Sequence, residues 1–108
     1  MNNVTAYIGR DFGRGEWSSK DVVMATLDAM QDHGIKGATF TEAVGFWNGE
    51  AENSIRVEML GVDVEAARAM LCDVCESLMQ WAIAYTIDGQ GHYMVEQDPT
   101  AARAAYSA

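Results

Sequence analysis

The sequence is poor in proline, cysteine and basic residues, and each shortage excludes a class of protein. With one proline and two cysteines in 108 residues, neither a proline-rich linker nor a disulfide framework organises the chain. Seven basic residues against sixteen acidic ones give a formal net charge of −9, which disfavours attraction to nucleic acid or an anionic membrane. No stretch approaches the ~20 apolar residues that a membrane-spanning helix needs, and the N-terminus does not resemble a signal segment. These shortages predict a cytoplasmic protein that binds neither nucleic acid nor membrane.

The sequence does have enough apolar residues for a single core. Hydrophobic residues make up 49% of the chain, and a chain of this length buries a core without metal or disulfide staples. We expect one domain over residues 1–97, followed by an alanine-rich tail, 98–108, that forms a marginal helix.

The stretch 38–61 is typical of two β-strands joined by a polar loop. In its second half, Ile55 and Met59 alternate with polar residues, which places them on one face of a strand. In its first half, Glu42 shares the parity of apolar neighbours. We therefore expect Glu42 to be partly buried and to need a cationic partner such as Arg56.

Two amphipathic helices flank this hairpin. The first is capped by Ser18 or Ser19 and ends before Gly34, and the second begins after Asp63 and ends near Gln80. The first helix should pack through a stripe of Val23, Leu27 and Met30. The packed face of the second helix is expected to contain Ala67, Met70, Leu71, Val74, Cys75 and Leu78.

Further strands are expected at residues 1–9, 82–87 and 92–96. The resulting order, β-α-β-β-α-β, predicts an α+β fold of the ferredoxin-like kind. In that arrangement, two helices cover one face of a four-stranded antiparallel sheet. A short C-terminal strand or helix would be added to it.

Cys72 and Cys75 form a C-x-x-C pair inside the second predicted helix. A zinc site needs two more ligands, and His33 and His92 lie far away in the sequence. We therefore predict two buried free thiols and no metal site.

The loop 9–17 has the most unusual composition in the chain. Three glycines allow close approach of a ligand, and Arg10 and Arg14 could bind a carboxylate or phosphate near a helix N-terminus. Its spacing matches no phosphate-binding motif. The alternative interpretation is a connecting loop whose arginines pair with Asp11, Glu16 or another subunit.

The predicted ligand site lies where this loop meets the hairpin loop. Because the first strand is expected to lie antiparallel to the strand at 38–47, the two loops should sit at opposite ends of one chain and meet only across a subunit boundary. We predict no catalytic residue. The predicted ligand-binding residues are Arg10, Arg14, Trp17, Trp47, Asn48, Glu52, Ser54 and Arg56.

The hairpin also resembles a known family. The run Thr39-Phe40-Thr41-Glu42-Ala43-Val44-Gly45-Phe46-Trp47-Asn48-Gly49, followed by Glu52-Asn53-Ser54, is similar to the PII-like and CutA-like small proteins. This resemblance implies a trimer with inward-facing sheets that binds small ligands, often nucleotides, between subunits. The chain departs from the nitrogen-regulatory members in its shorter hairpin loop and in lacking a basic phosphate-binding motif near its C-terminus.

Two functions follow from these observations. The first is a non-catalytic protein that senses or sequesters an anionic, nucleotide-like small molecule at a subunit interface, without a cofactor, as a homo-oligomer and more readily a trimer than a dimer. The alternative is a small dimeric ferredoxin-like enzyme with a cavity between sheet and helices, using His92 or Tyr85 as a proton carrier. The clustering of arginine, glycine and aromatic residues in two loops favours the first.

Overall fold

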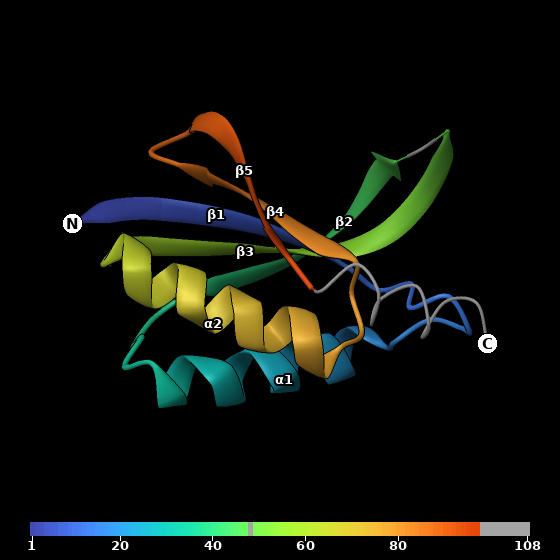
Figure 1. The fold of residues 1–108 in the computed structure, drawn as a ribbon, viewed down its shortest axis with the longest axis horizontal. Coiled ribbons are helices and arrows are strands. Elements are labelled where there is room, and N and C mark those ends of the chain that lie inside the picture. The colour runs from blue at the N-terminus through green and yellow to red at the C-terminus, as the bar shows by residue number, and fades with distance from the viewer. Residues whose placement is uncertain (48, 98–108) are drawn as a thin grey trace.

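The computed structural model describes residues 1–47 and 49–97, apart from the side chains of Trp47 and His92. The predicted site residue Asn48 and the predicted helix in the tail lie outside these residues. The elements are β1 (Asn2–Gly9), α1 (Ser19–Asp32), β2 (Thr39–Trp47), β3 (Glu50–Val62), α2 (Val64–Ser77), β4 (Ala82–Ile87) and β5 (Gln90–Glu96) (Figure 1).

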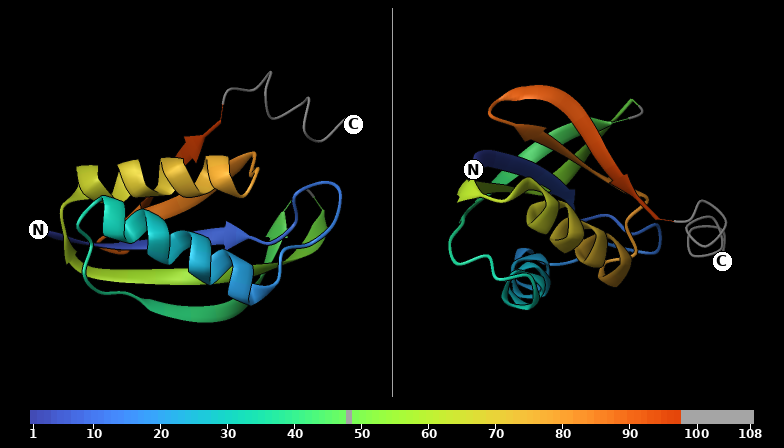
Figure 2. Two further views of the ribbon diagram at one scale, coloured as in Figure 1. Left: turned by 90° about the horizontal axis from the view of Figure 1, so that it is seen from below. Right: turned by 60° about the vertical axis from the view of Figure 1, so that its left-hand side comes forward.

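The strands form one antiparallel sheet in the order β2-β3-β1-β4-β5. Both helices lie on the same face of this sheet (Figure 2), so the predicted α+β arrangement with two helices on one face is confirmed. The predicted sheet of four strands is too small. A short strand or a helix was expected after the four-stranded sheet. A strand forms: β5 pairs with β4 and is the fifth strand, at the edge of the sheet.

The core lies between the helices and one face of the sheet. Alternation in the strands places every second side chain there, including Val4 and Ile8 of β1 and Ile55 of β3, all essentially buried. The predicted packed face of α2 is confirmed. Its six members, Ala67, Met70, Leu71, Val74, Cys75 and Leu78, are all buried.

The predicted packed stripe of α1 is wrong in part. Leu27 is 39% exposed, whereas Thr26 is fully buried on the face that contacts the core. The burial of a polar residue is tolerated because the Thr26 hydroxyl donates a hydrogen bond to the carbonyl of Val22, 2.7 Å away. Hydrophobic periodicity alone therefore misplaces the face by about one residue.

The helix ends explain how the chain enters the site. Ser18 and Asp21 form the capping box at the start of α1, and Asp63 caps α2, as predicted. However, α2 ends at Ser77, three residues before the predicted end. Met79 then takes the left-handed conformation (φ 52°), and this turn is followed by Gln80, Trp81 and the start of β4 (Ala82).

Two predictions about individual side chains are wrong. Glu42 is exposed and accepts a hydrogen bond from the Ser19 hydroxyl, while Arg56 pairs with Glu58 at 2.9 Å instead. Cys75 is buried as predicted, but Cys72 is exposed. The two residues are three positions apart in α2, and Cys75 faces the sheet whereas Cys72 does not. Burial, followed by the neighbouring Cys72, raises the pKa of the Cys75 thiol to about 11.

None of the described helices is both long and apolar enough to cross a membrane. Within residues 1–47 and 49–97, no three His, Cys, Asp or Glu side chains gather as a metal site would require.

Candidate functional site

The loop after β1 and the β2–β3 hairpin meet within one chain. β1 runs antiparallel to β3, with Gly9 opposite Ser54, so its end lies beside the start of β3. The backbone N–H of Arg10 donates to the carbonyl of Asn53 at 2.9 Å. The prediction that these segments lie at opposite ends of the chain is wrong, because β1 pairs with β3 and not with β2.

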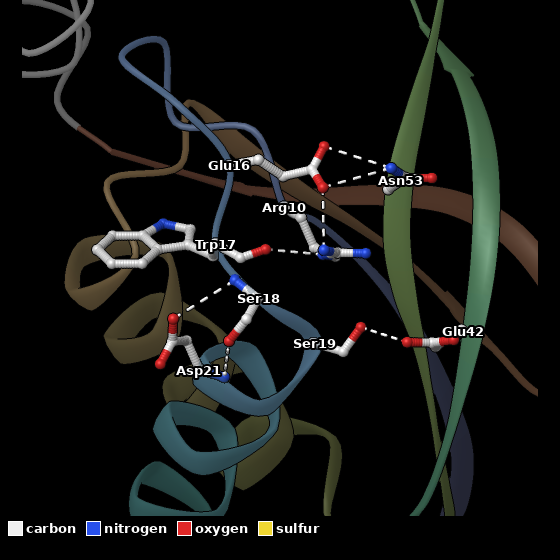
Figure 3. A network of polar contacts seen from close by, with 8 residues as sticks. All are labelled: Arg10, Glu16, Trp17, Ser18, Ser19, Asp21, Glu42 and Asn53. Atoms are coloured by element: carbon white, nitrogen blue, oxygen red, sulfur yellow. Dashed lines mark hydrogen bonds and ion pairs between the residues drawn. The ribbon is translucent and has the colours of Figure 1, made fainter.

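Arg10 holds the loop together instead of presenting a free charge (Figure 3). Its Nε donates to the carbonyl of Trp17 at 2.7 Å, and its Nη2 lies 2.9 Å from the Glu16 carboxylate. Glu16 in turn accepts a hydrogen bond from the Asn53 amide at 3.3 Å. The Trp17 indole donates to the carbonyl of Leu78 at 2.9 Å and packs against the core. For Arg10, these contacts match the alternative interpretation of a connecting loop whose arginines are paired.

Arg14 is exposed at the tip of the same loop. Trp47 lies in β2 opposite Glu50, and its side chain is outside the described atoms. Arg14 is not among the residues that line the pocket described next.

A pocket of about 400 Å³ opens on the face of the sheet that the helices leave uncovered. This size is within the usual range for small-molecule sites. It is lined by Tyr7, Gly9, Asp11, Gly45, Phe46, Glu52, Ser54, Gln80, Trp81, Ala82, Ala84 and Met94. Of the predicted site residues, the structure brings Glu52 and Ser54 into this pocket.

Small residues on neighbouring strands create the floor of the pocket. Gly9 lies opposite Ser54 in the β1–β3 pair, and Gly45 lies opposite Glu52 in the β2–β3 pair. Ala84 in β4 lies opposite Tyr7 of β1 and Met94 of β5. Directly opposed residues share a face, so these short side chains leave a hollow where larger ones would fill the sheet surface. Larger apolar residues beside it are Trp81 and Met94. Phe46 borders it too, but it follows Gly45 in β2, so alternation directs its side chain to the other face of the sheet.

The Glu52 carboxylate lies directly over Gly9. A Cβ added to Gly9 would stand 2.3 Å from Glu52 Oε1, so any larger residue at position 9 would displace the carboxylate. Partial burial is the main cause that raises the pKa of Glu52, and the negative charges of Asp11 and Glu16 raise it further. All three effects disfavour the ionised form of Glu52. A cationic ligand bound nearby would favour the ionised form and lower the pKa of Glu52.

Gln80 closes one end of the pocket. Its side chain is almost fully buried, and its amide donates to the carbonyls of Asp11 at 3.1 Å and Leu78 at 3.4 Å. This amide fixes the connection between α2 and β4 against the loop that follows β1. Trp81 follows directly and forms part of the pocket wall.

Sequence reasoning missed most of the lining, including Tyr7, Gln80 and Met94. One signal was present. Gly9, Gly45, Ala82 and Ala84 are small residues at one parity of their strands, and this pattern indicates a hollowed sheet face. It can be recognised only once the strand register is known.

No family model matches the chain, and no curated protein matches it. Solved structures with a similar fold are found. A phage SAM lyase in complex with S-methyl-5′-thioadenosine is similar with a TM-score of 0.74 and 20% identity, over 89% of each chain. A phage SAM lyase in the apo state is similar with a TM-score of 0.73 and 20% identity, over 90% of each chain.

This similarity extends over nearly the whole domain and shows a shared α+β fold.

Proposed function

We propose that the open-face pocket binds S-adenosylmethionine (SAM) and that the chain cleaves it, releasing S-methyl-5′-thioadenosine. The observation that carries this proposal is the Glu52 carboxylate, half-buried over Gly9 in a pocket with apolar walls. The similarity in fold to a phage SAM lyase supports it. A small-molecule enzyme was the alternative inferred from the sequence. Its cavity was expected between sheet and helices, whereas this pocket lies on the other face of the sheet.

The charge of the pocket favours this ligand over an anion. SAM carries a permanent positive charge on its sulfonium sulfur, and a partly buried carboxylate attracts such a charge more strongly than an exposed carboxylate in bulk water does. Glu52 and Asp11 both line the pocket, while Arg10 is held by Glu16. The anionic ligand inferred from the sequence remains a prediction, and the local charges weigh against it.

The apolar walls suit the rest of the molecule. Trp81 offers a flat surface for a planar nucleoside base, and Met94 adds a polarisable side chain. A nucleoside as part of the ligand was also expected from the family resemblance. The nucleotide-binding part of the PII-like interpretation remains a prediction.

The proposed reaction breaks the bond between the sulfonium sulfur and the γ-carbon of the methionine part. The bonding electron pair goes to sulfur, which leaves as the neutral thioether of S-methyl-5′-thioadenosine. The four-carbon part then either loses a β-proton and becomes an alkene, or closes to a lactone when its own carboxylate oxygen bonds to the γ-carbon. In the first route ionised Glu52 accepts the proton, and in the second it orients the sulfonium group so that the γ-carbon faces the attacking carboxylate oxygen.

We also propose that the fold is ferredoxin-like with one added edge strand. The order β2-β3-β1-β4 is the one that two interleaved β-α-β units produce, and β5 extends it.

The assembly inferred from the sequence, a homo-oligomer and more readily a trimer than a dimer, remains our proposal. Near the hairpin end of β2, Phe46 and Val44 are 78% and 72% exposed, on the face of the strand opposite to Gly45. Exposed apolar side chains of this kind mark interaction surfaces. Light scattering coupled to size-exclusion chromatography should give a mass above that of one chain, and a stable monomer at micromolar concentration would contradict the proposal.

The function is tested by incubating the purified chain with SAM and identifying the products by mass spectrometry. We expect S-methyl-5′-thioadenosine together with one four-carbon product. The alkene and the lactone are isomers of equal mass, so proton NMR, in which only the alkene shows vinyl protons, tells them apart. SAM that binds but remains intact would return the protein to the non-catalytic binder inferred from the sequence. The absence of both binding and cleavage would overturn the proposal.

A further inference from the structure

The open face of the sheet has a second charged group beside the pocket, on the same strand as Glu52. Along β3, the residues Glu52, Ser54, Arg56 and Glu58 all point to this face, because every second residue of a strand does. Glu52 and Ser54 line the pocket. Arg56 comes next along the strand, about 7 Å beyond Ser54.

Arg56 is connected to the pocket through Tyr7. The two residues lie directly opposite each other in the β1–β3 pair, and Tyr7 lines the pocket. The Tyr7 phenol beside it is the largest cause that raises the pKa of Arg56, ahead of the Glu58 carboxylate. Arginine only donates hydrogen bonds, and a phenol O–H can donate as well, so both groups could donate to one ligand carboxylate.

Glu58 leaves much of the Arg56 guanidinium available. It contacts Nη2 alone at 2.9 Å, and both side chains are more than a third exposed. A guanidinium carries five N–H donors, so several remain for a ligand. In addition, Arg56 is the only lysine or arginine within the five described strands.

We propose that Arg56, together with the Tyr7 hydroxyl, binds the carboxylate of the amino-acid part of the substrate. This inference rests on the proposed function and deepens it. The substrate is then held by opposite charges at two points along β3, with its cationic groups towards Glu52 and its carboxylate towards Arg56. Such a polarity selects a zwitterionic amino-acid group and fixes which end of the molecule enters the acidic end of the pocket.

The charges allow a sharp test with two compounds that cannot undergo sulfonium cleavage. S-Adenosylhomocysteine keeps the amino-acid group on a neutral thioether, and its decarboxylated form, S-adenosyl-3-thiopropylamine, lacks only the carboxylate. An acidic pocket by itself favours the decarboxylated compound, which is a cation. A preference for S-adenosylhomocysteine therefore requires a cation that binds the carboxylate.

Isothermal titration calorimetry would measure both dissociation constants for the wild type, Arg56→Met and Arg56→Lys. We expect the wild type to bind S-adenosylhomocysteine about 10- to 100-fold more tightly, the range for a charge-assisted hydrogen bond. In Arg56→Met this preference should disappear or reverse, and Arg56→Lys should restore it in part. Arg14→Met is the matched control, because it removes one exposed arginine from a loop outside the pocket lining. Its preference should equal that of the wild type.

Tyr7→Phe tests the bridging hydroxyl. It should reduce the preference less than Arg56→Met does, and the two changes should not be additive in the double variant, because they affect one hydrogen-bonded group. Independent additive effects would overturn the role of Tyr7.

A wild type that binds the two compounds equally, or an Arg56→Met variant that keeps the full preference, would overturn the inference. The proposed function is measured separately, by the release of S-methyl-5′-thioadenosine from SAM. SAM cleavage without a carboxylate preference would overturn the role of Arg56 alone. A carboxylate preference without SAM cleavage would overturn the proposed reaction alone, and a wild type that binds neither compound would overturn the inference outright.

Discussion

The two faces of the sheet differ in the size and charge of their side chains. On the face covered by the helices, large apolar side chains such as Ile8, Ile55 and Leu71 are fully buried. On the open face, Gly9, Ala84 and their neighbours are too small to fill the surface, and charged side chains stand beside them. The first face stabilises the fold, and the second leaves space for a ligand. Substitutions on the two faces should therefore separate stability from function.

The largest effect on stability is expected from Leu71→Ala on the covered face. Leu71 is fully buried between α2 and the sheet, so its truncation leaves a cavity and should cost about 2 to 5 kcal/mol of unfolding free energy. Denaturant unfolding measures the loss. The rate of SAM cleavage per folded molecule should stay near that of the wild type, and a specific loss of rate in folded protein would break the distinction between the faces.

The open face should respond in the opposite way to Gly9→Ala. The added methyl group would displace the Glu52 carboxylate, so cleavage should fall about 10- to 100-fold, in keeping with the strict geometric requirements of catalysis. Because the displaced atoms are the end of a flexible side chain and Gly9 does not need a left-handed backbone, stability should change by less than about 1 kcal/mol.

Gly37→Ala is the matched control for this substitution. An added Cβ there meets nothing within 4 Å, and its backbone is likewise outside the left-handed region. It should keep the activity of the wild type. Equal activity in Gly9→Ala and Gly37→Ala would show that the position of the carboxylate over Gly9 is unimportant.

Arg10→Met distinguishes the loop brace from a binding residue. Arg10 is 20% exposed and bonds to the Trp17 carbonyl and the Glu16 carboxylate. Its loss should lower the unfolding free energy by about 1 to 2 kcal/mol, the scale of a charge-assisted hydrogen bond. Thermal unfolding would show the change. A variant with wild-type stability but weaker SAM binding would instead support the anion-binding role inferred from the sequence.

The smallest effect is a gain in stability in Glu52→Gln. A folded-state pKa above the ordinary value of 4.5 means that ionising Glu52 costs more in the folded state than in the unfolded state. Its contribution is therefore favourable at low pH and is lost as the pH rises through the folded pKa. Glu52→Gln should be more stable than the wild type at pH 7, by less than about 1 kcal/mol because the group is partly exposed, and the difference should vanish below about pH 4. A destabilised variant at pH 7 would contradict the cause given for the shift.

The covered face could be predicted from the sequence because it depends on local periodicity. Alternation in β3, the apolar face of α2 and both helix caps are all patterns within about 15 neighbouring residues. The exceptions also have local causes. Thr26 is buried because its hydroxyl bonds within its own helix, and α2 ends early at a left-handed Met79.

The open face could not be predicted because it depends on strand register. Gly9, Gly45 and Ala84 come from three strands and form one floor only after β1 pairs with β3 and β4. Among the predicted site residues, Glu52 and Ser54 line the pocket. They lie in the first part of β3, near the hairpin turn, where they pair with Gly45 and Gly9. The arginines of the first loop were singled out by composition, which does not show that Arg10 is already paired with Glu16.

The most direct test of the central claim is the rate at which Glu52→Gln releases S-methyl-5′-thioadenosine from SAM, measured beside the wild type and Glu50→Gln. Glu50 is exposed, lies two residues earlier in β3 and is absent from the pocket lining, so its substitution removes the same charge outside the site. We predict a loss of about 100-fold or more in Glu52→Gln, as for other acid–base or charge-stabilising groups, and wild-type rates in Glu50→Gln. Comparable rates in all three proteins would show that the reaction does not depend on the carboxylate over Gly9, and would contradict the account.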